Sequence, residues 1–335
     1  MPTVIGTLLP PRLALPTADA ILPPRIVAPT APRTSSPIPA PGRTTPTLAA
    51  LPLATLPTNR AFLGIYDSPD APFAGVTLDV GHTFIDWGDS TALTRGIVAA
   101  RQKQRVPLLT IEPWRSDGGT GQNVLRDTTQ GENDVIIRAN AWAIKANAPQ
   151  VVLVRFAHEM ELTGNYPWAV ADPGEYIRAY RHYVDLFHSE GVTNVRWVWS
   201  PAGNANAPTY YPGDTYVDYV GVSILGYKAW DVRFGADDAV PFDELFGGKY
   251  ATLSRFGKPI IIAELGVASD TKAEQAQWLR DALTVMPKYS LLAGVVQFNA
   301  VNAPNQWAGD TPDWRITPDI LWQPEDLPRN PVFLR

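Results

Sequence analysis

Short runs of apolar residues recur along the chain from about residue 62 onward, and patterns typical of helices lie between most of them. Each run is bounded by polar or loop-forming residues, as expected for strands that are buried on both faces of a parallel sheet. We therefore predict eight strands, at residues 62–66, 82–87, 107–111, 151–156, 195–199, 217–223, 259–264 and 294–298.

Amphipathic helices are clearest at three places between these runs, residues 91–104, 173–189 and 271–286. The second has Asp172 as a predicted N-cap and Pro173 at the first helical position, and its apolar residues form one stripe. The third follows Asp270, which we take as its cap. Strand and helix alternating over roughly 275 residues predict the α/β class and a (β/α)8 TIM barrel.

The amino-terminal segment differs from the rest in composition. Residues 1–58 are dominated by Pro, Ala, Thr and Leu, and Asp19 is their single acidic residue. Prolines at this density interrupt helical hydrogen bonding, so we predict a disordered or polyproline-II tether at 1–58 and a catalytic barrel at 59–335. The prolines also interrupt every candidate apolar core of a secretory signal.

Composition and charge argue against several classes of function. The chain of 335 residues has a formal charge of −5, which argues against nucleic acid or an anionic membrane as its partner. No run approaches the roughly 20 apolar residues of a membrane span. There is no cysteine, and no G-x-G-x-x-G or P-loop opens a predicted helix, so we expect no thiolate metal site and no cofactor.

Acidic and aromatic residues gather at the carboxyl ends of the predicted strands, where barrel enzymes carry their chemistry. The strand at 151–156 leads into His158 and Glu159, and the strand at 259–264 ends in Glu264. Cleavage of a glycosidic bond requires two such carboxyl groups, one as acid and one as nucleophile or base. The structural alternative is that each glutamate forms an ion pair, with Arg155 or Arg196 as its partner.

Two further interpretations concern the same strand ends. His158-Glu159 could begin the zinc motif H-E-x-x-H, but the sequence runs H-E-M-E-L, so we predict no metal. Glu112 either hydrogen-bonds sugar hydroxyls or closes a polar network. Five rings near the strand ends are candidate platforms for stacking sugars, with ordinary packing as the alternative for each: Trp114, Tyr166, Trp168, Trp230 and Trp307.

The motifs at these strand ends resemble those of glycoside hydrolase family 26, a family of β-mannanases and lichenases. The resemblance spans roughly residues 60–322. It rests on R-F-A-H-E-M at 155–160 with Y-P-W at 166–168, T-I-E-P-W at 110–114, Y-Y-P-G-D-T-Y-V-D-Y-V-G at 210–221, K-P-I-I-I-A-E-L-G at 258–266 and D-W-R at 313–315.

This resemblance implies a role for individual residues. Glu159 would be the acid/base and Glu264 the nucleophile, with His158 contacting the reacting sugar and Tyr227 supporting the nucleophile. Two positions depart from the family's pattern: Glu161 stands where lichenase-like members usually carry Asn, and Gln297 where an aromatic residue is common. Both departures leave the substrate open.

We therefore predict a retaining endo-β-glycanase that degrades a β-linked polysaccharide by a double displacement. Mannan, mixed-linkage glucan, xylan and an exopolysaccharide remain open as substrates. We expect a monomer that is secreted or periplasmic and has no nucleic-acid partner and no membrane span. The alternatives are a barrel that binds carbohydrate without turnover and, ranked last, an aldolase or phosphate-dependent isomerase, for which no strand-end lysine or phosphate loop is present.

Overall fold

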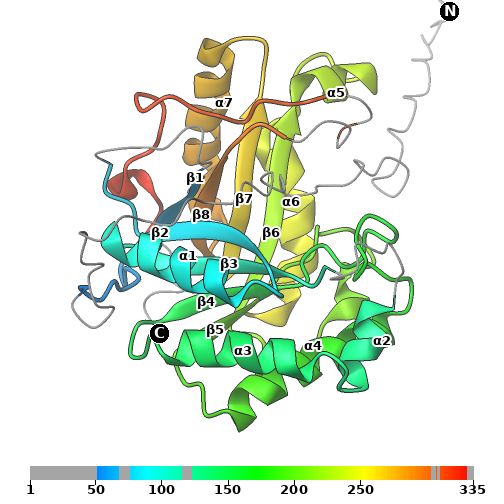
Figure 1. Cartoon of the computed structure of the whole chain (residues 1–335). Coiled ribbons are helices and arrows are strands. Elements are labelled where there is room, and N and C mark those ends of the chain that lie inside the picture. The colour runs from blue at the N-terminus through cyan, green and yellow to red at the C-terminus, as the bar shows by residue number, and fades with distance from the viewer. Residues whose placement is uncertain (1–50, 68–75, 115–122, 303–306, 308–309, 330–335) are drawn as a thin grey trace, which may run out of the picture.

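A computed structural model describes residues 51–67, 76–114, 123–302, 307 and 310–329 (Figure 1). Eight parallel strands form a closed barrel in chain order, which confirms the predicted (β/α)8 fold. The strands are β1 (Phe62–Asp67), β2 (Val80–Asp86), β3 (Val106–Glu112), β4 (Val152–Phe156), β5 (Val195–Trp199), β6 (Tyr219–Tyr227), β7 (Ile260–Ala268) and β8 (Leu292–Asn299).

Helices lie outside the strands and cover the barrel (Figure 1). They are α1 (Ser90–Gln102), α2 (Val124–Thr129), α3 (Asp134–Lys145), α4 (Pro173–Ser189), α5 (Lys228–Arg233), α6 (Phe242–Leu253) and α7 (Lys272–Val285). Short 3-10 turns occur at Ala207–Tyr210, Asp214–Tyr216, Ser254–Phe256, Met286–Lys288 and Pro324–Asp326. None of the helices within the described ranges is long and apolar enough to span a membrane.

The helix caps show how far local sequence determines the boundaries. Helix α4 has the predicted limits, and the Asp172 carboxylate accepts a 2.8 Å hydrogen bond from the Gly174 N–H. The predicted cap of α7 is wrong by one residue, because Thr271 takes the extended conformation and forms a capping box with Glu274. Asp270 instead forms a 2.9 Å ion pair with Lys228.

Strand β6 differs most from its prediction. It begins at Tyr219 and continues beyond Ser223 to Tyr227, because Ile224 and Leu225 continue the apolar run. Its register against β7 shifts between Val222 and Ser223. The shift pairs Ser223 directly with Glu264, which becomes important for the site.

Side chains from all eight strands meet in one cluster inside the barrel. Its buried members are Phe62, Val80, Val106, Leu108, Leu153, Val198, Ile261, Ala263 and Val296, with Tyr219 packed against them. Gly294 on β8 makes room for the Phe62 ring, since a Cβ at this position would lie 2.2 Å from a ring carbon. The barrel is therefore a packed core and not a pore.

Residues 51–58 lie against this core, although we predicted them to be part of the tether. Ala54 belongs to the same cluster, and its N–H and carbonyl exchange hydrogen bonds of 2.9 and 3.0 Å with the Gln150 amide. Arg101 donates a 2.6 Å hydrogen bond to the Leu51 carbonyl. Residues 51–58 have no apolar periodicity, and hydrogen bonds from the Gln150 amide and the Arg101 guanidinium help to hold them on the barrel instead. The remainder of the predicted tether, residues 1–50, lies outside the described residues.

A chain beginning at Asn59 is accordingly expected to unfold at a lower temperature than one beginning at Leu51. The shorter chain loses the burial of Ala54 and the hydrogen bonds that Gln150 and Arg101 make with residues 51–58, which costs roughly 2 kcal/mol, or about 5 °C in Tm. Calorimetry of the two proteins measures the difference. Equal unfolding temperatures would show that residues 51–58 add no stability.

Candidate active site

Glu159 lies directly beyond β4, on a tightly turned segment. Ala157 and Glu159 both adopt left-handed backbone conformations, with φ of 49° and 53°. Such a conformation is costly for residues other than glycine, and a 2.8 Å hydrogen bond from the Glu159 N–H to the Ser200 carbonyl beyond β5 helps to hold it. Glu159 is only 2% exposed. From this turn its carboxyl group reaches Ser223 on β6, whose hydroxyl donates a hydrogen bond to it.

Glu264 lies within β7 and is fully buried. Its Oε1 accepts a 2.6 Å hydrogen bond from Nη1 of Arg155, which is itself fully buried on β4. Burial raises the pKa of Glu264 above its ordinary value, Arg155 opposes this shift, and Glu159 adds to it. The second oxygen, Oε2, is buried without a partner among the described residues. It is therefore the oxygen with capacity left for a bound molecule.

Ser223 connects the two glutamates. Its hydroxyl donates to Glu159 Oε1 at 2.6 Å and lies 3.5 Å from Glu264 Oε1, so the two carboxylate oxygens are no more than about 6 Å apart. Arg155 Nη2 also donates to the Ser223 hydroxyl, at 3.3 Å. Sequence analysis missed Ser223 because no motif marks a serine inside a buried strand. The register shift between β6 and β7 is what places it here.

A third carboxyl group, that of Glu112, lies at the end of β3. It is 3% exposed, and its Oε2 accepts a 3.0 Å hydrogen bond from the indole N–H of Trp114. Burial raises its pKa from the usual 4.5 to about 8, with a further contribution from the charge of Glu264. Its Oε1 has no partner among the described residues. Near neutral pH Glu112 is therefore a protonated acid that can donate a hydrogen bond to a sugar hydroxyl.

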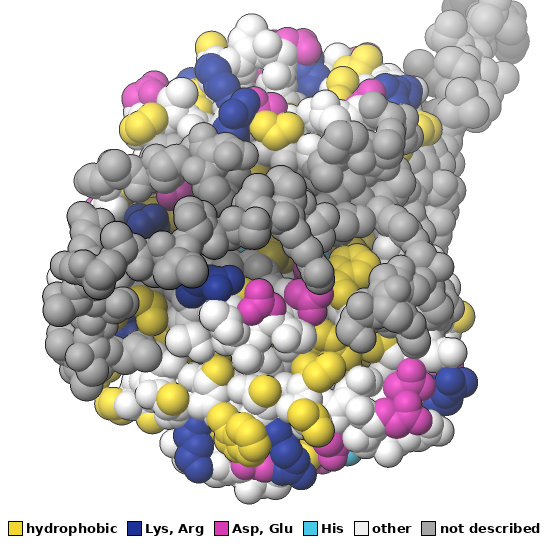
Figure 2. Space-filling view, viewed as in Figure 1, with side chains coloured by type: hydrophobic (Ala, Val, Ile, Leu, Met, Phe, Trp, Pro, Cys, Tyr) yellow, Lys and Arg dark blue, Asp and Glu magenta, His cyan; other side chains and the backbone are white. Residues whose placement is uncertain are grey.

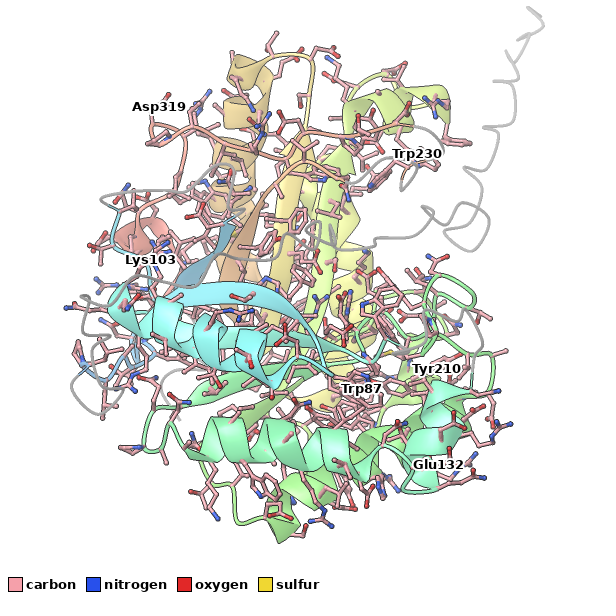
Figure 3. All side chains as sticks on the ribbon, viewed as in Figure 1. Trp87, Lys103, Glu132, Tyr210, Trp230 and Asp319 are labelled. Atoms are coloured by element: carbon pink, nitrogen blue, oxygen red, sulfur yellow. The ribbon has the colours of Figure 1, made fainter. Side chains whose placement is uncertain are left out.

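The raised pKa of Glu112 predicts how the stability of the fold depends on pH. The folded protein holds the Glu112 proton between about pH 4.5 and pH 8, whereas the unfolded chain releases it, so stability is lost as the pH rises through this interval. Glu112→Gln removes the ionisation, and at pH 9 we expect it to unfold roughly 5 °C above the wild type. The gain is expected to vanish at pH 5. The matched control is Glu132→Gln at the exposed edge of the molecule (Figure 3). A gain that does not change with pH would contradict this account.

His158, the residue before Glu159, is fully buried, and its contact with the reacting sugar stays a prediction. Neither of its ring nitrogens has a hydrogen-bond partner in the described part of the chain. Burial and the positive charge of Arg155 lower its pKa well below the ordinary value, so the ring is neutral. Its surroundings are aromatic, with the Tyr166 ring 5.2 Å and the Phe84 ring 6.0 Å away. A neutral imidazole with both nitrogens unpaired can donate one hydrogen bond to a sugar and accept another.

The predicted sugar platforms fall into two groups, and the first lies next to Glu159. Trp168 is fully buried, stacks on Tyr166 at 4.6 Å and donates a 2.7 Å hydrogen bond to the His158 carbonyl, so it packs the site and offers no free face. Tyr166 is 2% exposed, and its hydroxyl donates to Glu159 Oε2 at 3.2 Å. Trp114 remains partly exposed above them, with its ring 5.0 Å from that of Trp168.

The second group comprises Trp230 and Trp307, and Tyr227, the last residue of β6, lies against it. The Trp307 ring is 5.5 Å from each of the other two, and Trp230 lies on α5 near the top of the view in Figure 3. Trp307 is 5% exposed, while Tyr227 and Trp230 keep more of their surface. The described hydrogen bonds to Glu264 come from Arg155 and Ser223, and the support from Tyr227 that the resemblance implies stays a prediction.

Contacts decide two further sequence interpretations, those of Glu161 and of the arginine partners, while Gln297 is described by its burial alone. Glu161 does not face a cleft: its Oε1 accepts hydrogen bonds from the Gly203 and Asn204 N–H groups at 2.8 and 3.3 Å. Gln297 is 3% exposed on β8. Of the two ion-pair partners considered for the glutamates, Arg155 pairs with Glu264, whereas Arg196 donates to the Val195 carbonyl. No cluster of three metal-binding side chains occurs within the described ranges.

The fold and these contacts define a (β/α)8 barrel with paired, buried glutamates beyond β4 and within β7. The sequence profile described as "Glycosyl hydrolase family 26" matches residues 126–252. Endoglucanase H of Acetivibrio thermocellus is 32% identical over 263 residues, which cover 74% of this chain and 27% of that protein. A mannan endo-1,4-beta-mannosidase of Bifidobacterium adolescentis is 25% identical over 216 residues, covering 56% of this chain and 21% of that protein. The chain thus spans about a quarter of the length of these curated relatives or less.

Solved structures show the same fold. The GH26 β-mannanase BoMan26A of Bacteroides ovatus superimposes with a TM-score of 0.59 at 18% identity, covering 78% of this chain and 85% of that one. An endo-β-1,4-mannanase double mutant of Cellulomonas fimi gives 0.55 at 18% identity, covering 76% and 67%. The profile match, endoglucanase H and the GH26 mannanase structures together support glycoside hydrolase family 26 as the family of this chain.

Proposed function

We propose that the chain is a retaining endo-β-glycanase, with Glu264 as nucleophile and Glu159 as acid/base. The observation that carries the proposal is the Ser223 hydroxyl, which lies within hydrogen-bonding reach of both carboxylates and limits the separation of their nearest oxygens to about 6 Å. Retaining glycosidases separate their carboxyl groups by about 5–5.5 Å, whereas inverting ones need about 6.5–9.5 Å to admit a water molecule.

The first step forms a covalent glycosyl-enzyme. The unpartnered Oε2 of Glu264 attacks the anomeric carbon, and the proton of Glu159 goes to the departing glycosidic oxygen. Arg155 holds the other oxygen of Glu264 at 2.6 Å, which fixes the direction of attack. The elevated pKa of Glu264 follows from its burial, and Arg155 is the group that counteracts it so that the carboxylate is available.

The second step returns the enzyme to its starting state. Once Glu264 is esterified, its negative charge is gone, and Glu159 remains as a carboxylate that takes a proton from the attacking water. Water then releases the sugar with the configuration of the substrate. The Tyr166 hydroxyl, 3.2 Å from Glu159 Oε2, orients the carboxylate in both steps.

The substrate is a β-linked polysaccharide, with β-mannan and β-glucan favoured by the relatives named endoglucanase and mannan endo-1,4-beta-mannosidase. Xylan and an exopolysaccharide belong to the same panel. We further propose a secreted or periplasmic enzyme, since polymers of this size are degraded outside the cytoplasm. On the face shown in Figure 2, described acidic and basic side chains are interspersed, which fits a neutral polymer better than nucleic acid.

A panel of soluble polysaccharides tests the proposal. We expect reducing ends to appear with at least one β-glycan, as mixed oligosaccharides at early times, and proton NMR to show retained anomeric configuration in the first product. Monosaccharide as the only early product would replace the endo assignment by an exo one. Binding without any reducing ends would support the carbohydrate-binding alternative.

A further inference from the structure

A lysine outside the barrel reaches the main chain of the residue that bridges the glutamates. Lys249 lies on α6, and its ammonium donates a 2.9 Å hydrogen bond to the Ser223 carbonyl. The Ser223 hydroxyl on the same residue donates to Glu159 Oε1 at 2.6 Å. Lys249 therefore holds the backbone at the register shift of β6, where the orientation of Ser223 is set.

The stem of Lys249 is confined by Gly203. A Cβ at Gly203 would lie 2.9 Å from both Cγ and Cδ of the lysine, and the glycine has a φ of +94° that other residues rarely adopt. The Gly203 N–H is bound in turn by Glu161 Oε1 at 2.8 Å. The Lys249 stem packs directly against the backbone of Gly203, where a side chain at position 203 would clash with it. This close packing leaves the lysine little freedom to point elsewhere.

The charges of two carboxylates act on the Lys249 ammonium. Burial lowers its pKa, and the negative charges of Glu159 and Glu161 oppose that shift, which places both acids within its field. The second oxygen of Glu161 is buried and has no hydrogen-bond partner in the described part of the chain. Other charged or titratable groups around Glu159 are Arg155 on β4, Glu264 on β7, and His158 and Tyr166 in the segment after β4.

We propose that Lys249 is a positioning residue for the acid/base: it anchors Ser223 against both glutamates, and its charge favours the carboxylate form of Glu159 that the second step needs. This inference rests on the proposed roles of Glu159 and Glu264. In this role Lys249 transfers no proton. Without its charge, Glu159 is expected to keep its proton to a higher pH.

Lys249→Met tests the charge, because methionine retains an unbranched stem of similar length against Gly203. Lys258→Met is the matched control, since Lys258 also donates a 2.9 Å hydrogen bond to a main-chain carbonyl, that of Asp214. The full chain is labelled with [δ-13C]glutamate, and the Glu159 signal is assigned by its loss in Glu159→Gln. We expect the titration midpoint of this signal to rise by about one pH unit in Lys249→Met and to stay unchanged in Lys258→Met.

A second readout separates positioning from simple structural support. The alkaline limb of the pH profile of kcat/KM, measured on whichever β-glycan the wild type cleaves, should move upward with the NMR midpoint. An unmoved midpoint in Lys249→Met, with or without a uniform loss of activity, would overturn the inference. If that variant does not fold, Lys249→Gln serves instead, because glutamine keeps a donor but no charge. The NMR midpoint needs no turnover, so it tests Lys249 even where the proposed hydrolysis fails.

Discussion

Glu264→Gln is expected to lower the rate of hydrolysis by about 10⁴-fold or more, measured on the polysaccharide that the wild type cleaves. Loss of a covalent nucleophile lowers the rate more than loss of an acid/base does. The amide oxygen can still accept the hydrogen bond from Arg155, but the amide has no negative charge with which to attack the anomeric carbon. Initial rates of reducing-end release measure the loss. Glu132→Gln, an exposed replacement of the same kind, is the control and should retain full activity.

The two common replacements of Glu264 are expected to differ in stability. Its ion pair with Arg155 is fully buried on both sides, so Glu264→Ala leaves an uncompensated guanidinium inside the barrel at a cost of about 3–5 kcal/mol. Glu264→Gln keeps a partner for Arg155 and should lose less. The difference follows from the position of Glu264, which is fully buried within β7. Thermal unfolding of both variants decides it, and equal stability would show that Arg155 does not depend on the carboxylate.

The fold could be predicted because the signals for it are local. Each buried strand is a continuous apolar run, and Asp172 followed by Pro173 gives the start of α4 without any tertiary information. Boundaries failed where neighbouring residues compete for one role, as Thr271 and Asp270 do at α7. The docking of residues 51–58 was missed because it depends on the Gln150 amide, 96 positions from Ala54 in the sequence.

The candidate site was predictable only in part. Glu159 and Glu264 stand out because a charged residue at the end of a buried run needs a reason. Arg155 is also a charged residue in a buried run, on β4. Its partner, Glu264, lies 109 residues away on β7, so sequence alone could not decide which of the two glutamates it pairs with. Trp168 shows a second limit of sequence analysis. As an aromatic residue near a strand end it was a candidate platform for sugars, but its ring is used for packing, because it is stacked on Tyr166.

Glu159→Ala is expected to lower activity by about 10²–10⁴-fold on polysaccharide, with the largest loss for the poorest leaving groups. An activated aryl glycoside needs little proton donation, so its first step should be largely spared and the glycosyl-enzyme should accumulate. A burst of the aryl leaving group, followed by a slow steady state, is the kinetic sign of this accumulation, and mass spectrometry of the intact protein detects the added sugar.

Azide should then restore the second step, because it attacks the glycosyl-enzyme without base catalysis and fits the space that the shortened side chain leaves. The product is a glycosyl azide with the configuration of the substrate, since Glu264 still supplies the first inversion. The Ser223 and Tyr166 hydroxyls, which donate hydrogen bonds to Glu159 in the wild type, become available to bind the azide anion. A glycosyl azide of inverted configuration would mean that azide had attacked the substrate directly. Full activity on polysaccharide without azide would remove Glu159 from the mechanism, whatever Glu264→Gln had shown.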